Sequence, residues 1–324
     1  MPGTVARPRA ENGPNEKVKK MSRLREKMTA TLLIAIFMIS IFAVAIPVSA
    51  QTTWTVPGNF ATIQEAIDSD DVHDGDTILV GNGEWYGGDI DKAVRIKGLH
   101  GAVIVDGPAY PHRDGEPDSQ YHIGFFIEPE GSGCTIEHFT FRGGPIGDTG
   151  NYLHFAVFGR YDVSDVTIKS NKIFNCIQCI SIVWGGSNWI ITHNVIEIAD
   201  YYMSSVGIFL TGSDGNIISH NKITAEAPIV GSGILISRSS ITGLTACYNK
   251  IVSNKITLIG PDVVAIKLTV PGISEEPTPE EIANAQSVFH DNTIQKNDLR
   301  GSTNPFSIAP PELEEVNTIS KNHQ

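Results

Sequence analysis

Histidine recurs along this chain at a spacing that would suit a metal ion. His193 and His220 each stand directly before an asparagine in successive copies of one short motif, and His138 holds the same position further upstream. If the copies stack as strands about 4.8 Å apart, two imidazoles there can share a metal ion or titrate together. Ser170 and Ser253 hold the position elsewhere and no third ligand is evident, so the alternative is a stacked surface pair without metal.

Carboxylates are the next candidates, because glycoside hydrolysis needs two of them about 5 to 10 Å apart. Asp162 and Asp200 are the candidate catalytic residues, but they fall in different predicted turns. Asp165 aligns with Asn188 at a turn position, and Asp214 is the remaining candidate. No arginine after residue 50 recurs at a matched position in consecutive repeats. Catalysis is therefore weakly indicated, and the alternative is a set of solvated turn carboxylates.

Aromatic residues give a clearer indication of a ligand. Trp184, Trp189, Tyr201 and Tyr202 fall within two repeats, at predicted turns or outward strand positions. Rings on a flat β surface can stack on sugar faces and bury area without charge. These four residues are therefore the predicted ligand-binding set, with ordinary turn packing as the alternative.

The elements that must position these residues are set by a repeat. The pattern apolar-x-x-Asn-x-apolar recurs every 23 to 43 residues, and a variant carries Phe139 in place of the asparagine. Self-similarity at this period predicts a solenoid. We expect asparagine at a sharp bend, because it tolerates left-handed backbone angles, and we expect its carboxamides to bond from coil to coil. The marker asparagines are Asn171, Asn194, Asn221, Asn254, Asn297 and Asn322.

A second motif precedes each marker and completes the coil. A small residue leads into alternating apolar positions, as in Gly207-Ile208-x-Leu210 and Gly233-Ile234-x-Ile236. Period-two alternation predicts a strand with every second side chain inward. Each coil then offers three short strands, and stacked coils bury a continuous core. The predicted fold is all-β, a single-stranded right-handed parallel β-helix over residues 51–324.

Caps and insertions are predicted at specific segments. Thr62 and Glu65 have capping-box spacing before a short helix through Ile67, expected to plug the N-terminal end of the solenoid. Thr278-Pro-Glu-Glu281 predicts an acidic helix through Gln286. Insertions at 237–249 and 269–291 are expected between the second and third strands of neighbouring coils, side by side as one wall. Further insertions are at 108–121 and 142–153. Three alternatives are open for the C-terminal end: further coils follow residue 324, a partner covers the end, or the acidic run at 310–315 folds over it.

Residues 1–50 are predicted to direct export. Residues 32–46 are uncharged and almost wholly apolar, basic residues precede them, and Val48-Ser49-Ala50 is a small-residue cleavage site. An upstream extension plus a signal peptide is the prediction, and an uncleaved membrane anchor is the alternative. The expected location is secreted, extracellular or cell-surface, or periplasmic where the source has an outer membrane.

Charge and cysteine content narrow the partners. Residues 51–324 carry 16 basic and 33 acidic residues, a balance of −17, which disfavours nucleic acid and other polyanions. The four cysteines are too few and scattered for a disulfide framework. Cys176 and Cys179 have redox-like spacing, but we expect the cysteines to be small apolar fillers of the coil interior.

The opening of the domain resembles a known family. Phe60-x-Thr62-Ile63-Gln64-x-Ala66-Ile67, followed by Gly75-Asp76-Thr77-Ile78-x-Val80 and Gly83-x-x-Tyr86, resembles the start of secreted right-handed β-helix proteins of the pectin-lyase-like superfamily. The downstream coils resemble the repeats that this group shares with NosD-type periplasmic accessory proteins and surface β-helix proteins. The matching residues are core and turn residues, so the resemblance, over about 54–322, specifies fold rather than chemistry.

Three functional hypotheses follow from the residues and the resemblance. The leading one is non-catalytic binding of a polysaccharide or cell-envelope component through the aromatic patch and inserted loops. The second is a polysaccharide lyase or glycoside hydrolase, which the resemblance would pair with calcium. The third is a NosD-like copper-linked accessory protein, disfavoured because Met203 is the only methionine after Met38 and cuprous ion prefers sulfur.

Overall fold

The computed structural model describes residues 51–109, 121–144, 153–198, 205–226, 230–239, 243–273 and 276–324. The predicted leader and the middles of the insertions at 108–121 and 142–153 lie outside these ranges. Residues Gln51–Gln324 form one compact unit. Within the described ranges, no helix is both long enough and apolar enough to span a bilayer.

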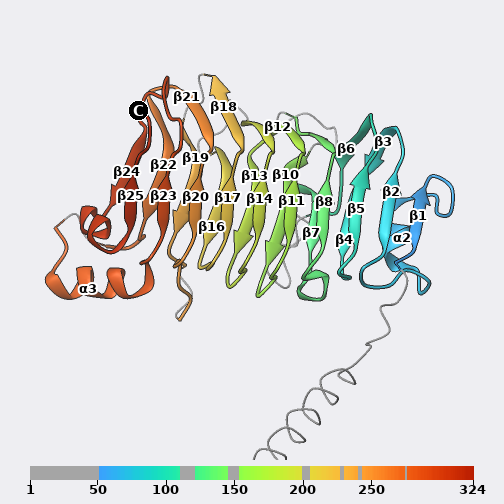
Figure 1. Ribbon diagram of the computed structural model, residues 1–324, viewed down its shortest axis with the longest axis horizontal. Coiled ribbons are helices and arrows are strands. Elements are labelled where there is room, and N and C mark those ends of the chain that lie inside the picture. The colour runs from blue at the N-terminus through green and yellow to red at the C-terminus, as the bar shows by residue number, and fades with distance from the viewer. Residues whose placement is uncertain are drawn as a thin grey trace, which may run out of the picture. The chain divides into compact units, whose positions relative to one another are not determined.

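Three parallel sheets, named A, B and C here, make up the described part of the solenoid (Figure 1). Sheet A contains β1 (Thr53–Val56), β2 (Thr77–Val80), β5 (Arg95–Gly98), β8 (Thr135–Glu137), β11 (Thr167–Lys169), β14 (Ile190–Thr192), β17 (Ile217–Ser219), β20 (Lys250–Val252), β23 (Thr293–Gln295) and β25 (Thr318–Ser320). Sheet B contains β3 (Gly83–Tyr86), β6 (Ala102–Asp106), β9 (Thr140–Arg142), β12 (Lys172–Cys176), β15 (Val195–Ile198), β18 (Lys222–Glu226) and β21 (Lys255–Ile259). Sheet C contains β4 (Gly88–Ile90), β7 (His122–Ile127), β10 (Leu153–Arg160), β13 (Gln178–Val183), β16 (Ser205–Thr211), β19 (Val230–Ser237), β22 (Asp262–Thr269) and β24 (Phe306–Ala309).

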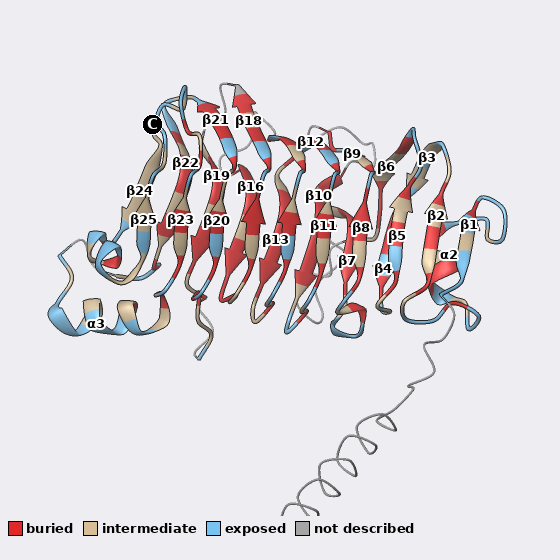
Figure 2. Cartoon of the chain, viewed as in Figure 1, coloured by how far each residue is buried: buried red, intermediate tan, exposed pale blue. Residues whose placement is uncertain are grey.

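From β4 to β21, each coil contributes one strand to each sheet, in the order C, A, B along the chain. The inward positions are aliphatic and pair in register from coil to coil: Ile168, Ile191 and Ile218 stack in sheet A and are fully buried. The burial map shows this continuous interior along the length of the coil stack (Figure 2). The predicted right-handed parallel β-helix, with three strands per coil, is confirmed.

The marker asparagines form a buried ladder at the turn from sheet A to sheet B. The side-chain oxygen of Asn221 accepts the main-chain N–H of Asn194 at 2.9 Å and its Nδ2 at 3.0 Å. Nδ2 of Asn221 also donates to the carbonyl of Ile191 at 2.9 Å. These bonds pair main-chain N–H and C=O groups at the turn, which would otherwise be buried without a hydrogen-bond partner. The predicted coil-to-coil bonding is confirmed.

The left-handed residue of each turn is the one before the asparagine, which corrects the sequence-based expectation. His193 and His220 both have φ 56°, as do their counterparts in other coils within a few degrees. The side chain of the asparagine must point inward, where it bonds the next coil. The change in chain direction is therefore made by the left-handed conformation of the preceding residue. The residues concerned are His138, Ser170, His193, His220, Ser253, Lys296 and Lys321.

A second asparagine ladder runs at the turn from sheet C to sheet A. Asn216 donates from its main chain and its side chain to Asn249, at 3.0 and 2.9 Å. Asn249 bonds Asn292 and Asn292 bonds Asn317 in the same way. The corresponding residue one coil before Asn216 is Trp189, whose main-chain N–H donates to the Asn216 side chain at 2.9 Å.

The caps follow the sequence closely. Helix α2 (Ile63–Asp68) is N-capped by Thr62 and buries Ile63, Ala66 and Ile67 against the first coils. Helix α3 (Pro279–Val288) has the predicted capping box between Thr278 and Glu281 and ends two residues beyond the predicted end. Two 3-10 helices, η1 (Pro129–Gly131) and η2 (Pro311–Val316), complete the helical elements of the described ranges.

The two later insertions lie elsewhere in the coil than predicted. They connect a sheet C strand to a sheet A strand, β19 to β20 and β22 to β23, which are the first and second strands of their coils. The second and third strands stay joined by the short asparagine turn, which leaves no room for an insertion. The insertions do adjoin each other, because Ala246 N–H donates to Val288 O at 2.9 Å and Tyr248 N–H to His290 O at 3.2 Å.

Candidate functional site

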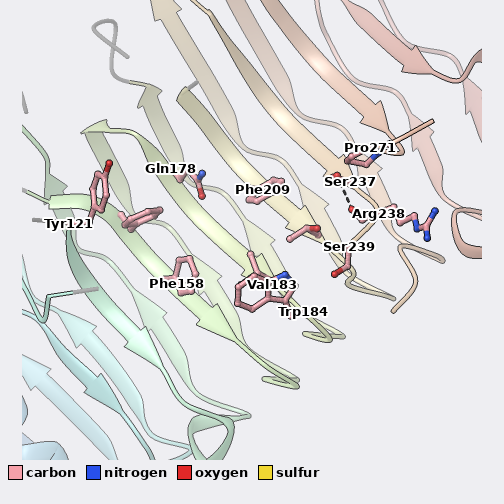
Figure 3. A pocket seen from close by; sticks show the side chains of 13 residues that line it. Tyr121, Phe158, Gln178, Val183, Trp184, Phe209, Ser237, Arg238, Ser239 and Pro271 are labelled. Atoms are coloured by element: carbon pink, nitrogen blue, oxygen red, sulfur yellow. Dashed lines mark hydrogen bonds between the residues drawn. The ribbon is translucent and has the colours of Figure 1, made fainter. Parts of the chain in front are cut away.

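A groove of about 730 Å³ lies on the outer face of sheet C (Figure 3). Strands β10, β13 and β16 supply its floor through outward side chains, while the inward neighbours of those side chains fill the core. A volume of this size suits a small chain of sugar rings or a similar ligand. The lining residues are Tyr121, Phe155, Phe158, Gln178, Val183, Trp184, Phe209, Thr211, Ser237, Arg238, Ser239, Pro271 and Gly272.

The groove floor is apolar although it faces outward. Phe158 pairs in register with Ser181 and Ser181 with Phe209, so the three lie in one row across neighbouring coils. Phe126, one coil before Phe158, stacks on it with ring centroids 6.0 Å apart and planes 16° from parallel. With Val183 and Ile123, these rings form a hydrophobic cluster separate from the main core. These four side chains are themselves buried, and the partly exposed Phe155, Trp184 and Phe209 pack against them and line the groove.

Trp184 stands at one rim of the groove within an aromatic and cationic stack. Its ring centroid lies 5.2 Å from that of Tyr161. The guanidinium carbon of Arg160 lies 4.4 Å from the Tyr161 centroid and 4.9 Å from that of Trp184, within cation–π range. Arg160 also donates from Nη2 to the Tyr161 hydroxyl at 2.6 Å. The contacts hold the indole in place before any ligand arrives, which lowers the entropy cost of binding.

The backbone at this rim is left-handed in consecutive coils. Tyr161 has φ 52°, Trp184 φ 61° and Gly212 φ 58°. The turn geometry therefore requires this conformation, which glycine adopts without cost and a bulky residue does not. Two coils nevertheless carry aromatics there. Strain of this kind, held by the surrounding structure, is a pointer to function.

The same rim is polar two coils further along the solenoid. Ser237, Arg238 and Ser239 line it where the chain leaves β19, and Pro271 and Gly272 line it where the chain leaves β22. These are the first residues of the two adjoining insertions. Arg238 and the serine hydroxyls place hydrogen-bond donors beside an aromatic floor, the combination that orients a hydroxylated ligand.

The structure also places carboxylates on sheet C that the sequence search missed. Asp89 pairs in register with the outward Phe126, and Glu128 follows the inward Ile127. Burial, followed by neighbouring carboxylates, raises the pKa of both side chains. The positive charge of Arg160 partly offsets this effect on the pKa of Glu128. A partly buried carboxyl with a raised pKa is the form that donates a proton in glycosidic cleavage.

The predicted carboxylates are turn residues. Asp162 is exposed in a left-handed turn beside Tyr161, with φ 55°. Asp165 and Asn188 share the same left-handed turn position, φ 61° and 59°, as the alignment predicted. Asp214 accepts a hydrogen bond from the main chain of Cys247 at 2.7 Å, which anchors a loop. The other candidate, Asp200, lies outside the described residues.

Of the predicted aromatic set, the structure brings Trp184 to the groove and removes Trp189 from it. Trp189 is fully buried in the core, and its Nε1 donates to Val163 O at 2.8 Å. Its assignment as a ligand-binding residue was wrong, because it occupies the inward end of the second asparagine ladder rather than an outward position. Tyr201 and Tyr202 lie outside the described residues. Phe155, Phe158 and Phe209 are the other aromatic residues of sheet C that line the groove.

The predicted histidine pair is present. The rings of His193 and His220 stack with centroids 5.1 Å apart and planes 6° from parallel, exposed on the turn before the asparagines. Across the described ranges, no group of three or more His, Cys, Asp or Glu side chains is placed to hold a metal ion. The stacking of the two rings is therefore present, and metal binding by the pair stays a prediction.

The cysteines are free and buried, as expected of interior fillers. Burial raises the pKa of Cys134 to about 12. Burial, followed by the adjacent Cys176, raises the pKa of Cys179 as well. A thiol held protonated in an apolar interior is a poor nucleophile and metal ligand.

Comparison with known proteins supports the architecture. A family model described as "Right handed beta helix region" matches residues 118–267. The catalytic domain of a GH87 α-1,3-glucanase, in complex with tetrasaccharides, is similar with a TM-score of 0.50 and 14% identity, over 76% of this chain and 39% of that one. The structure of Escherichia coli YbhC is similar with a TM-score of 0.51 and 12% identity, over 83% of this chain and 78% of that one. The structure of an exopolygalacturonase from Thermotoga maritima is similar with a TM-score of 0.48 and 11% identity, over 76% of this chain and 70% of that one.

The family match and the two structures with TM-scores of 0.50 and 0.51 support the fold. The chain has a right-handed parallel β-helix fold, which is the fold that the resemblance at its N-terminus implied. It spans about two fifths of the length of the GH87 catalytic domain. Among curated proteins, no sequence matches it.

Proposed function

We propose that residues 51–324 bind a glycan in the groove on sheet C, without cleaving it, and that residues 1–50 direct their export to the cell surface or surroundings. The observation that carries the proposal is the aromatic floor, with Trp184 fixed at its rim by Tyr161 and Arg160. Sugar rings present flat C–H faces to aromatic rings and hydroxyls to polar groups. The groove offers both, with Arg238 and serines at one end.

The charge balance favours a neutral chain over a strongly acidic one in this groove. The domain carries a surplus of 17 acidic residues, which repels polyanions, nucleic acid included. The polysaccharide partner is in keeping with the GH87 α-1,3-glucanase domain, which has a similar fold and was solved with tetrasaccharides.

Glycan cleavage is the second candidate, because one specific observation favours it. Asp89, Glu128 and Arg160 lie on the same sheet as the groove, and both carboxyls have raised pKa values. A protonated Glu128 would donate to a glycosidic oxygen while an ionised carboxylate stabilised the sugar cation. Neither carboxylate lines the groove, so cleavage would require a bound chain that extends beyond the groove to Glu128.

The test is a binding and product assay on the exported domain. Neutral glucans and acidic polysaccharides are titrated, then incubated for days with and without calcium, and reducing ends and unsaturated products are measured. The proposal expects saturable binding to a neutral glycan and no new ends. Trp184→Ala should weaken this binding by roughly 30-fold, whereas Tyr248→Ala should not change it. Tyr248 is a matched control, because it is an exposed aromatic with φ 60° on a different turn.

Product formation that Glu128→Gln abolishes would overturn the non-catalytic proposal in favour of cleavage. Binding that Trp184→Ala leaves intact would overturn the groove as the site.

A further inference from the structure

A basic cluster on the outer face of sheet A surrounds one carboxylate. Glu137 on β8 has only 1% of its side chain exposed. Arg95 contacts its Oε1, Lys169 Nζ lies 3.2 Å from its Oε2, and Lys97 Nζ lies 4.0 Å from its Oε1. His138 Nδ1 lies 3.7 Å from Oε2. Neighbouring coils thus aim three permanent cations at a single anion.

The cations outnumber the carboxylate and remain accessible. The side chains of Arg95, Lys97 and Lys169 are 46%, 34% and 38% exposed. One carboxylate neutralises one of the three, which leaves a local surplus of positive charge in a domain that is otherwise strongly acidic. Lysine ammonium groups carry three donors each, and Glu137 at 4.0 Å satisfies Lys97 weakly. The cluster therefore has spare capacity to bind an anion from solvent.

A hollow of about 250 Å³ adjoins the cluster on the N-terminal side of Arg95. Arg95 itself lines this hollow, together with Thr77, Thr135 and Gln51. Its size fits a single sugar ring, and its hydroxyl and amide groups can hydrogen-bond one. A charged group on that ring would reach the guanidinium.

We propose that sheet A carries a second site, in which Arg95, Lys97 and Lys169 bind the carboxylate or sulfate of an anionic sugar unit whose ring lies in the adjoining hollow. This site is on a different face from the groove on sheet C and does not depend on it. Glu137 acts as an internal anion that holds the three cations together when no ligand is present.

The test measures affinity for two acidic probes, an oligogalacturonate and a heparin-type sulfated oligosaccharide, with a neutral malto-oligosaccharide as reference. Lys97→Gln should weaken binding of the preferred acidic probe by about fourfold, the effect of one unit charge near 5 Å in water. The matched control is Lys250→Gln, an exposed lysine on β20 of the same sheet. It should leave the affinity unchanged. Rising salt should weaken the interaction.

Glu137→Gln gives the sharper result. Removing the internal anion raises the net positive charge of the cluster, so the acidic probe should bind about fourfold more tightly. A cluster whose only role is to join coils predicts the opposite, a less stable protein with no gain in affinity. Glu137→Gln is expected to lower the stability of the protein. Lys97→Gln therefore provides a test of anion binding that does not depend on the Glu137 variant.

The proposal is overturned if neither acidic probe binds, or if Lys97→Gln and Lys250→Gln have equal effects. Trp184→Ala separates the two sites: it should weaken neutral glycan binding and leave acidic probe binding unchanged. Preference between the two probes identifies the charged group as carboxylate or sulfate.

Discussion

The main-chain N–H of Trp189 donates to the side chain of Asn216 at 2.9 Å, which places the tryptophan at the end of a buried asparagine ladder. Asparagine replaces the tryptophan in the following coils, as Asn216, Asn249 and Asn292. The large indole thus fills space that the later coils fill with hydrogen-bonded carboxamides. Trp189 stabilises the fold and does not reach the groove.

Replacing Trp189 by Phe should lower stability without affecting the ligand. The change removes the indole donor to Val163 O, which keeps only the main-chain N–H of Ser187 at 3.2 Å, and it shrinks a fully buried side chain. We expect the free energy of unfolding to fall by about 1–3 kcal/mol. Urea denaturation measures the loss, and glycan titration should give the same affinity as the unchanged protein. A loss of affinity at full stability would contradict the buried placement.

Asn221→Ala should be far more destabilising than any exposed change in the same coil. It removes the acceptor for two Asn194 donors and the donor to Ile191 O, all buried. Leaving several buried groups unpaired predicts a loss of about 2–5 kcal/mol. Lys222→Ala, an exposed residue beside it, should change stability by less than about 0.5 kcal/mol. Similar midpoints for the two variants would argue against the ladder's importance.

Glu128→Gln should stabilise the protein at neutral pH. The pKa of Glu128 is raised in the folded state, first by burial and then by Asp89. As the pH rises, the unfolded chain therefore ionises first, so stability falls between the unfolded and folded pKa values and stays lower above them. Glutamine removes this penalty. Thermal melts from pH 3 to 8 should converge at the acid end and separate at neutral pH; separation at the acid end alone would refute the assignment.

The four thiols should resist modification in the native protein. All four are buried, and the pKa of Cys134 is raised to about 12 by burial. A thiol reagent at pH 8 should therefore label the native chain slowly and the denatured chain completely. Rapid labelling of Cys176 or Cys179 in the native state would favour a redox role for that pair.

The sequence predicted the fold because the solenoid repeats its determinants. The inward face can be read from the spacing of Asn194, Asn221 and Asn254 and from the strand motif that precedes each of them. Both signals lie within one short stretch of sequence in each coil. The second ladder was missed because its first member is Trp189, so the column carries no uniform residue type. The left-handed backbone conformation was assigned to the asparagine instead of the residue before it. The spacing of the motif locates the turn but does not show which of its residues has the positive φ.

The groove was only partly predictable. Trp184 was found because aromatic residues cluster there, while Phe158 and Phe209 were not singled out, although Phe209 occupies the outward position of Gly207-Ile208-x-Leu210. The signal was present: β10 and β16 are apolar on both faces, where an outward polar residue is the usual pattern. Asp89 and Glu128 were missed because register between coils of unequal length is set by the inserted loops, which spacing alone does not resolve.

The most direct test is calorimetric titration of one neutral oligosaccharide into the unchanged domain and into Trp184→Phe, Trp184→Ala and Tyr248→Ala. If the indole at the groove rim carries the recognition, Trp184→Ala should lose about 2 kcal/mol, roughly 30-fold in affinity, with Trp184→Phe between the two and Tyr248→Ala unchanged. Equal affinities for all four proteins, each shown to be folded, would contradict the proposal that the outer face of sheet C binds glycans.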